Sequence, residues 1–335
     1  MKTQVLAAGE DAFRQAAGLL RAGKLVGIPT ETVYGLAADA LNPQAVLDIF
    51  AAKGRPADNP LIVHICDLAQ MEQLANPPAL AYELANAFWP GPLTMTLPRK
   101  SIVPDCVTAS LPTVGIRMPS HPAAAAIIRL SGPLAAPSGN RSGSPSPTNA
   151  GDMLADMDGR IPLIVDGGSC GVGVESTVIL VQEDRVRLLR PGGVTVDQLR
   201  QFCPVEVDDG VLHQLAPDAR AASPGMKYRH YAPKASVILV EGSTDAFRDY
   251  LVSVQEEGCF ALAPEEECSL LPCPAVPLGR KGDDLSQAQA LFAALRECDR
   301  RGAKTVYARA PHRDGVGLAI YNRLLRAAGF QVVKL

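Results

Sequence analysis

Three segments of the chain combine basic side chains with turn residues and with hydroxyl or amide groups. They span residues 53–60 (KGRPADNP), 136–143 (APSGNRSG) and 223–233 (SPGMKYRHYAP). Guanidinium and ammonium groups bind phosphate and carboxylate oxygens, and successive backbone N–H groups in tight turns bind the same anions. The segments therefore indicate a protein that positions charged small molecules.

The first two segments also have a plainer interpretation. Lys53, Arg55 and Asn59 follow a predicted helix and precede a buried strand, so they could form a solvated turn with two exposed cations. The loop that begins at Ala136 is rich in Ser, Pro and Gly, and it could be a flexible surface loop instead of an anion-binding nest. Residue types alone leave both alternatives open.

His64 and Arg117 lie in apolar strands, where a polar side chain needs a reason. His64 shares a strand face with Ile62, and it either packs as a half-buried residue or donates to a substrate carboxylate. Arg117 follows Thr113 by four residues on another strand, so the two share a face. A buried arginine needs an anion, which is either a protein carboxylate or a ligand carboxylate.

Two further stretches carry hydroxyl groups that could take part in binding or chemistry. Thr30 and Thr32 follow a strand that ends at Pro29, and their hydroxyls either cap the next element or contact a small polar ligand. Residues 167–171 (GGSCG) fit the G-x-S-x-G nucleophile elbow, but an elbow requires a following helix and a β-like run follows here. The stretch also lacks the ending of a P-loop. The pattern therefore argues against a serine hydrolase and a P-loop NTPase.

The elements that must position these side chains mix helices and strands over residues 1–205. Hydrophobic periodicity predicts helices over 11–22, 43–53, 67–75, 79–88 and 122–130. It predicts strands over 24–29, 61–65, 93–97, 114–119, 134–136 and 163–165, and a hairpin over 174–190. This mixture favours an α+β catalytic domain with a mixed sheet, within a chain of the α/β class.

A change of character follows this domain. Residues 206–234 lose regular periodicity and predict a linker that is long by the norms of loops, so we expect it to be functional or disordered. Residues 235–335 then alternate strand and helix, which predicts a smaller parallel-sheet domain with Rossmann-like winding. Its first strand is not followed by G-x-G-x-x-G, so no dinucleotide is predicted.

Composition limits the functional classes. The 335 residues carry a formal net charge of -3, and neither domain is basic: residues 1–205 contain 16 basic and 18 acidic residues, and residues 235–335 contain 12 and 13. Aromatic residues make up 5%, which argues against a platform for single-stranded nucleic acid. The eight cysteines show no zinc spacing, and no signal or membrane-spanning run is evident, so we expect a cytoplasmic protein with reduced thiols.

Eight motifs follow one another along the chain: residues 29–36 (PTETVYGL), 53–56 (KGRP), 59–64 (NPLIVH), 89–94 (WPGPLT), 115–119 (GIRMP), 136–140 (APSGN), 175–178 (ESTV) and 190–192 (RPG). This ordered set resembles the threonylcarbamoyl-AMP synthase family, whose catalytic unit is the YrdC-like domain. The resemblance covers nearly the whole chain, and the linker and second domain look like the longer, two-domain branch of the family.

The resemblance implies a fold and a reaction. The fold would be a twisted mixed sheet with a concave, basic cavity, followed by the smaller Rossmann-like domain. The reaction would convert L-threonine, bicarbonate and ATP into threonylcarbamoyl-AMP and pyrophosphate, for the threonylcarbamoyl-adenosine modification of tRNA. Mg²⁺ would accompany ATP without assigned protein ligands. Transient contact with tRNA or with the threonylcarbamoyl transferase machinery is a further implied partnership, and no membrane is involved.

The resemblance also implies site residues. Lys53, Arg55 and Arg117 would be catalytic, with Arg117 holding the threonine carboxylate. The threonine site would contain Thr32, His64, Arg117, the backbone of Ala136, and Ser176. The ATP site would contain Lys53, Arg55, Asn59, Thr113, Ser138, Ser146, Arg190 and Tyr231.

The chemistry suits a cavity of cations, because a carbamate and ATP are both anionic and must be held in line. Tyr228, Arg229, His230 and Tyr231 of the linker would close over this cavity and exclude water from labile intermediates. Two alternatives are an RNA-binding module without catalysis and a carbamoyl transferase that uses carbamoyl phosphate. The near-neutral domains disfavour the first, and the lack of zinc-finger cysteine spacing disfavours the second.

Overall fold

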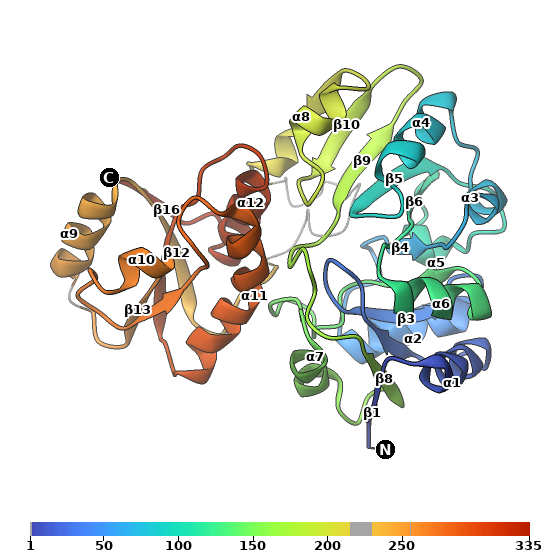
Figure 1. The fold of residues 1–335 in the computed structure, drawn as a ribbon, viewed down its shortest axis with the longest axis horizontal. Helices are drawn as coiled ribbons and strands as arrows, with labels where there is room; N and C mark the ends of the chain where they lie inside the picture. The colour runs from blue at the N-terminus through green and yellow to red at the C-terminus, as the bar shows by residue number, and fades with distance from the viewer. Residues whose placement is uncertain (1, 215–229, 255) are drawn as a thin grey trace.

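The computed structural model describes residues 2–214, 230–254 and 256–335. Two sheets form the frame of two domains that lie side by side (Figure 1). The larger sheet has the strand order β1-β8-β2-β3-β7-β4-β6-β5-β9-β10-β11, and the smaller has the order β14-β13-β15-β12-β16. Part of the linker predicted over 206–234, with Tyr228 and Arg229, lies outside the described residues.

The larger sheet is mixed, as the sequence predicted. It contains antiparallel pairs such as β5 with β6 and parallel pairs such as β4 with β6. Its strands are β1 (Gln4–Ala7), β2 (Val26–Ile28), β3 (Gly35–Asp39), β4 (Ile62–His64), β5 (Leu93–Pro98), β6 (Thr113–Arg117), β7 (Leu134–Ala135), β8 (Leu163–Asp166), β9 (Thr177–Val181), β10 (Val186–Arg190) and β11 (Val205–Val207). The predicted hairpin is the antiparallel pair β9 and β10.

Helices cover both faces of this sheet. The apolar sides of α1 (Glu10–Arg21) and α6 (Pro122–Ser131) share one core cluster with β2 and β8. Helices α2 (Pro43–Lys53), α3 (Leu68–Leu74), α4 (Ala79–Phe88) and α7 (Ala150–Met157) pack into the other, larger cluster. The short helices of this domain are α5 (Asp105–Thr108), α8 (Val196–Arg200) and the 3-10 turn η1 (Asp209–Val211).

Helix α2 shows why the first basic segment lies where it does. The side chain of Asn42 accepts hydrogen bonds from the backbone at the helix N-terminus, and Pro43 occupies the first turn. Gly54 ends the helix with φ of 61°, a left-handed conformation that glycine adopts without a Cβ penalty. Lys53 is therefore the last helical residue, and Arg55 begins the loop that leads to β4.

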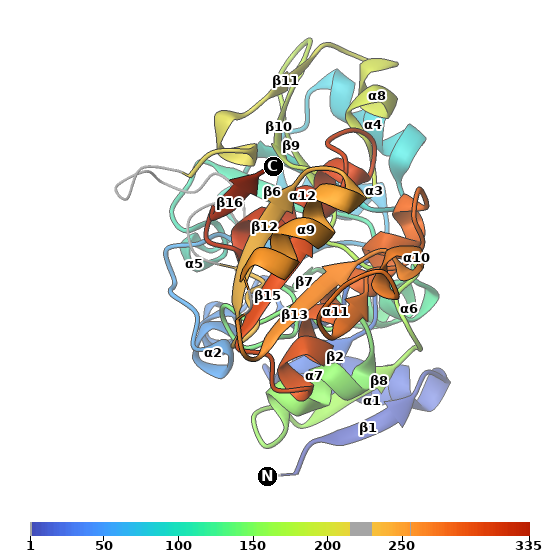
Figure 2. The same ribbon diagram turned by 90° about the vertical axis from the view of Figure 1, so that its left-hand side faces the viewer.

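The smaller sheet is parallel throughout its described strands, as predicted for a Rossmann-like unit. Its strands are β12 (Ser236–Glu241), β13 (Cys259–Ala263), β14 (Ala275–Pro277), β15 (Thr305–Arg309) and β16 (Val332–Lys334). Helices α9 (Thr244–Val254) and α10 (Glu265–Cys268) lie on its outer side, and α11 (Asp284–Arg300) and α12 (Gly317–Ala327) lie between it and the larger domain (Figures 1 and 2).

The two domains share a hydrophobic core. Val33 and Val174 of the first domain are buried in one cluster with Phe292 of α11 and Leu324 of α12. Tyr231, which precedes the second domain, belongs to the same cluster. The helices α11 and α12 therefore bring side chains of the second domain to the edge of the first.

The sequence did not predict several short elements. Strands β1, β3, β11 and β14 have three to five residues, and α7 lies in a stretch that offered no strong periodicity. Strand β3 was hidden in the motif that follows Thr32. Such short strands are fixed by pairing with neighbours in the sheet instead of by their own pattern.

Candidate functional site

A buried pocket gathers most of the side chains that the sequence singled out. It lies where β2, β4, β6 and β9 meet the loop after β7 and the start of the second domain. Its cavity measures about 50 Å³. The lining residues are Thr30, Thr32, Val33, Gly35, Arg55, Ile62, His64, Arg117, Ala136, Pro137, Ser138, Glu175, Ser176, Arg190, His230 and Tyr231.

Arg117 is the central cation of one half of the pocket. Its Nη1 donates to Thr32 Oγ1 at 2.8 Å, and its Nε donates to the Gly91 carbonyl at 3.3 Å. Its Nη2 lies 2.6 Å from Glu31 Oε1, an ion pair that lacks the alignment of a linear hydrogen bond. The protein carboxylate that the sequence left open as a partner is thus Glu31. Burial opposes ionisation of Glu31, but the charge of Arg117, together with hydrogen bonds from Arg117 and from the backbone, outweighs burial and lowers the pKa of Glu31.

His64 lies beside Arg117 on the neighbouring strand. The strand alternation is confirmed, because Ile62 and His64 line the pocket while Val63 and Ile65 belong to the hydrophobic core. Burial, together with the Arg117 charge, lowers the pKa of His64 to about 3. The imidazole is therefore neutral at physiological pH. Its Nδ1 lies 3.3 Å from the Ile62 carbonyl, which can only accept, so Nδ1 donates there and Nε2 is left as an acceptor in the pocket.

Ser176 and Arg190 form another wall of the pocket, which Thr30 and Thr32 also line. Ser176 Oγ is 2.7 Å from the hydroxyl of Thr94, and Arg190 reaches it with Nη2 at 3.2 Å. The Nε of Arg190 donates to the Ser176 carbonyl at 3.1 Å. The wall therefore presents a fixed hydroxyl and a buried guanidinium to whatever occupies the pocket.

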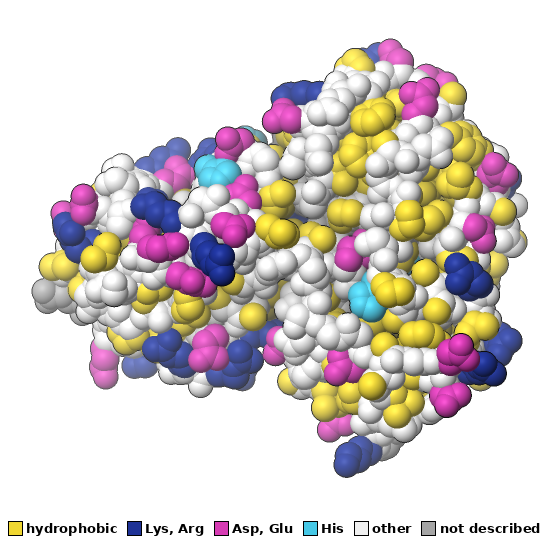
Figure 3. Space-filling model, in the orientation of Figure 1, with side chains coloured by type: hydrophobic (Ala, Val, Ile, Leu, Met, Phe, Trp, Pro, Cys, Tyr) yellow, Lys and Arg dark blue, Asp and Glu magenta, His cyan; other side chains and the backbone are white. Residues whose placement is uncertain are grey.

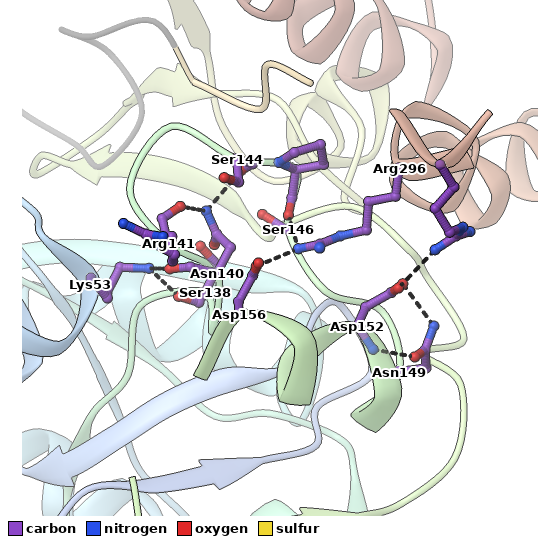
Figure 4. Close-up of polar contacts among 12 residues, drawn as sticks. Lys53, Ser138, Asn140, Arg141, Ser144, Ser146, Asn149, Asp152, Asp156 and Arg296 are labelled. Carbon is purple, nitrogen blue, oxygen red and sulfur yellow. Dashed lines mark hydrogen bonds and ion pairs between the residues drawn. The ribbon is translucent and has the colours of Figure 1, made fainter. Parts of the chain in front are cut away.

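Lys53 holds the loop after β7 through hydrogen bonds to its backbone. The Lys53 ammonium donates to the carbonyls of Ser138 and Asn140, both at 2.5 Å (Figure 4). Burial, together with the charge of Arg55, lowers the pKa of Lys53 well below its usual value. Lys53 itself does not line the pocket, and it supports the loop that carries Ser138.

Ser146, farther along this loop, is tied to a buried carboxylate. Its Oγ donates to Glu175 Oε1 at 2.5 Å, and Glu175 Oε2 accepts from Arg323 Nε at 2.9 Å. Burial opposes ionisation of Glu175, but the charges of Arg323 and Arg190 outweigh it and lower its pKa. Ser146 is thus one contact away from the pocket that Glu175 lines.

A second arginine of the smaller domain also reaches this loop. Arg296 of α11 donates to the Pro145 carbonyl at 2.5 Å and pairs with Asp156 at 2.6 Å (Figure 4). Asp156 belongs to α7, which follows the loop. Lys53 and Arg296 therefore hold the two ends of one loop from opposite sides.

His230 and Tyr231 close the side of the pocket that faces the second domain. Both line it, and the ring of Tyr231 packs 5.4 Å from that of Phe292. The backbone N–H of Ala232 donates to the Gly143 carbonyl at 2.8 Å. Nε2 of His230 is buried and has no hydrogen-bond partner among the described residues.

The structure brings together nine of the residues that the sequence proposed for the site. These are Thr32, Arg55, His64, Arg117, Ala136, Ser138, Ser176, Arg190 and Tyr231. Lys53 and Ser146 contact lining residues. Asn59 is buried beside Arg55, which reaches its carbonyl at 3.4 Å, and Thr113 begins β6. These last two are not among the lining residues.

Sequence reasoning missed three charged residues that shape the site: Glu31, Glu175 and Arg323. Glu31 and Glu175 lie inside two of the quoted motifs, and each precedes a threonine or serine of the site, so an unexplained carboxylate was the available signal. Arg323 offered no signal, because it lies in an ordinary amphipathic helix of the other domain.

Two family models match the chain in succession. The first, described as telomere recombination, matches residues 18–192. The second, described as the C-terminal domain of threonylcarbamoyl-AMP synthase, matches residues 194–329. Their order follows the order of the two domains.

Relatives match the whole chain or half of it. The threonylcarbamoyl-AMP synthase of Bacillus subtilis is 46% identical over 342 residues, 99% of this chain and 97% of the relative. That of Pseudomonas putida is 32% identical over 180 residues, 53% of this chain and 96% of the relative. The crystal structure of Pyrococcus abyssi Sua5 complexed with L-threonine is 42% identical, with a TM-score of 0.93, and it covers 99% of this chain and 100% of that chain.

Proposed function

The chain belongs to the threonylcarbamoyl-AMP synthase family and forms threonylcarbamoyl-AMP and pyrophosphate from L-threonine, bicarbonate and ATP; we propose that the pocket around Arg117 and Arg190 is where it does so. The observation that carries this proposal is the gathering of buried cations, hydroxyls and two neutral histidines in a single pocket. Two anionic substrates need such a surface, because it offsets their mutual repulsion.

L-threonine would occupy the half of the pocket around Arg117. The guanidinium offers a planar fork that matches a carboxylate, and Glu31 holds it in place. Thr32, His64, Ser176 and the backbone of Ala136 surround the same space. The similarity to a Sua5 protein crystallised with L-threonine supports this proposal.

ATP would occupy the half that is bounded by Arg55, Ser138, Arg190 and Tyr231. Lys53, Ser146, Asn59 and Thr113 complete the proposed ATP site. Lys53 contacts the Ser138 and Asn140 carbonyls, and Ser146 contacts Glu175. In this structure Lys53 and Ser146 therefore support the loop of residues 136–149, which we call the nucleotide loop. A phosphate that approached Lys53 would compete with those carbonyls for the ammonium.

The reaction joins the substrates in two steps. The threonine amine nitrogen bonds to the carbon of bicarbonate, and water leaves, which gives a carbamate. A carbamate oxygen then bonds to the α-phosphorus of ATP while the bond to the pyrophosphate oxygen breaks. Arg117 would fix the threonine, and Lys53 and Arg55 would stabilise the growing charge on the phosphates. No protein nucleophile is required.

His230 and Tyr231 would act as the described part of a lid. The cavity of about 50 Å³ that they help to enclose is far below the roughly 300 Å³ at which ligand pockets begin. Side chains that line the cavity must therefore rearrange when ATP binds, and His230 and Tyr231 would be among them. On return they would exclude water from the carbamate and the adenylate.

Mg²⁺ would accompany ATP and the departing pyrophosphate, with phosphate oxygens and water as its main ligands. Among the described residues, no group of three His, Cys, Asp or Glu side chains is arranged to hold a metal ion. In the part of the chain that the structure describes, no helix has both the length and the apolar character needed to cross a membrane. The eight free cysteines suit a reducing, cytoplasmic setting.

The product would pass to the tRNA-modifying transferase, by release or by transient contact. On the face shown in Figure 3, basic and acidic side chains are interspersed over the smaller domain, a pattern that does not favour direct tRNA binding there. A filter-binding assay over a range of salt concentrations would measure any direct affinity for tRNA.

Pyrophosphate release from ATP tests the proposed site. Wild-type protein is expected to release pyrophosphate only when threonine and bicarbonate are both present, and omission of either should abolish release. Arg117→Met should lower kcat/KM for threonine about a hundredfold, because it removes the guanidinium that would hold the threonine carboxylate. Release that continues without threonine, or an Arg117→Met variant with wild-type kinetics, would defeat the assignment of this pocket.

A further inference from the structure

Glu175 places a negative charge in a pocket that must receive anions. It is 6% exposed, it lines the cavity, and it lies next to Ser176 at the start of β9. An unpaired carboxylate at this position would repel the phosphates of ATP, because charges interact strongly where water is excluded. The site therefore needs a permanent counter-ion for Glu175.

Arg323 of α12 meets this need from the other domain. It is fully buried, and its Nε donates to Glu175 Oε2 at 2.9 Å. Its Nη2 donates to the Glu175 carbonyl at 3.2 Å, and its Nη1 donates to the Pro191 carbonyl at 2.7 Å. The guanidinium thus binds the Glu175 carboxylate and also the backbone carbonyls of Glu175 and Pro191, which are the neighbours of Ser176 and Arg190 in the chain.

The same arginine reaches the remaining parts of the nucleotide half. Its guanidinium carbon lies 5.6 Å from the centre of the Tyr231 ring. Through Glu175 it is linked to Ser146, whose hydroxyl donates to the other carboxylate oxygen. Arg323 therefore contacts Tyr231 directly. Through Glu175 it is also linked to Ser146 of the nucleotide loop and to the Ser176–Arg190 wall.

We propose that Arg323 is a positioning residue for the ATP half of the reaction, which neutralises Glu175 and fixes Ser146 and Tyr231 around the nucleotide. The proposal rests on the proposed function of the pocket. It gives the second domain a defined part in the chemistry: docking of α12 completes the electrostatics of the nucleotide half. Arg323 acts through Glu175 and needs no contact with substrate.

The two substrates should respond differently to loss of this arginine. Arg117, which would hold the threonine carboxylate, is itself held by Glu31, Thr32 and Gly91, all in the first domain, so this contact keeps its supports. In the ATP half, Glu175 would keep only Arg190 of the two arginines whose charges oppose its own. The signature is a rise in KM for ATP with KM for threonine nearly unchanged, which a general loss of folded protein does not produce.

A charge-removal cycle in the full-length protein tests the mechanism. Arg323→Met is expected to raise KM for ATP roughly tenfold, because a buried charge left without its partner costs at least that much in binding. Glu175→Gln removes the repelling charge itself and should raise KM for ATP less than Arg323→Met does, since Gln still accepts from Ser146. The double variant should recover most of the loss.

Arg300→Ala is the matched control. Arg300 is 56% exposed on the neighbouring helix α11 and pairs across the same domain boundary with Asp152 at 3.4 Å. It makes no described contact with Glu175, so its kinetics should match the wild type. If wild-type protein releases no pyrophosphate from ATP with threonine and bicarbonate, the proposed function of the pocket is refuted. That failure is distinct from a failure of the role of Arg323, which is judged by the variants.

Two results would overturn the proposal: Arg323→Met with an unchanged KM for ATP, or a double variant as impaired as Arg323→Met. The second would show that Arg323 acts by holding the domains together and not by neutralising Glu175. If Arg323→Met does not fold, Arg323→Lys and Arg323→Gln replace it. The lysine variant should stay closer to wild type in KM for ATP than the glutamine variant, and equal values would overturn the proposal.

Discussion

Two pairs of an arginine and a glutamate, each with one member in the pocket lining, flank the pocket, and they are built differently. Arg117 and Glu31 both belong to the first domain, whereas Arg323 and Glu175 are 148 residues apart and belong to different domains. The first pair forms when one domain folds. The second forms only when α12 docks on the first domain. The arginine of the threonine half is therefore held within one domain, whereas the ATP half depends on an interface.

The largest expected effect comes from breaking the pair within one domain. Arg117→Met should lower kcat/KM for threonine about a hundredfold, because it removes a buried, charge-assisted contact and leaves Glu31 unpaired. KM for ATP should change little. Steady-state pyrophosphate release, with each substrate varied in turn, measures the split.

Arg99→Met serves as the control for this variant, since Arg99 pairs with the exposed Asp105 away from the pocket. Equal losses toward threonine and ATP in Arg117→Met would show that the two halves are not separate.

Acid should destabilise both halves through their buried histidines. Burial, followed by the Arg117 charge at His64 and the Arg55 charge at His230, lowers the pKa of each imidazole to about 3. Below pH 6.5, about the pKa of histidine in the unfolded chain, the unfolded chain binds protons that the folded protein does not. The free energy of unfolding therefore decreases as the pH is lowered. Each histidine should contribute about 2 kcal/mol of loss between pH 7 and pH 5.

Urea unfolding at the two pH values measures this loss. His64→Gln and His230→Gln should each reduce the difference, and the exposed His213→Gln should not. A reduction by only one of the two would show that the other imidazole titrates in the folded protein, and hence that its half of the pocket is wetter.

Loss of the Tyr231 ring, which packs against the second domain, should have a moderate effect on kcat/KM for ATP. Tyr231→Ala removes the packing against Phe292 and the contact with the Arg323 guanidinium. We expect roughly a tenfold fall in kcat/KM for ATP, the loss typical of a truncated aromatic anchor. Threonine kinetics should be less affected, and Tyr82→Ala, on the remote helix α4, provides the control. A selective defect toward threonine would place the lid over the other half.

The smallest effect is expected from the second anchor of the nucleotide loop. Arg296→Ala removes the donor to the Pro145 carbonyl and the ion pair with Asp156, where both side chains are only slightly exposed. KM for ATP should rise about threefold, in keeping with a partly solvated pair. Arg300→Ala, one turn farther along α11, should not change it. A rise as large as that of Arg323→Met would make the loop, and not the charge of Glu175, the main link between the domains.

Local patterns made part of this molecule predictable from sequence. The helix that ends at Lys53 follows from an Asn cap, a first-turn proline and a terminal glycine, all within one segment. The placement of His64 toward the pocket follows from strand alternation with Ile62. The parallel second domain follows from its regular alternation of strands and helices. Each of these is decided by neighbours in the chain.

The sequence by itself determined the type of both domains, their order and the chemical character of the pocket. Only the tertiary structure decided that Arg117 pairs with Glu31, that Lys53 supports the loop around Ser138, and that Arg323 reaches Glu175. The physical reason is that periodicity and caps act within a few residues, whereas a buried charge takes its partner from whatever element packs against it. Here that element is a helix of the other domain, which no local pattern could reveal.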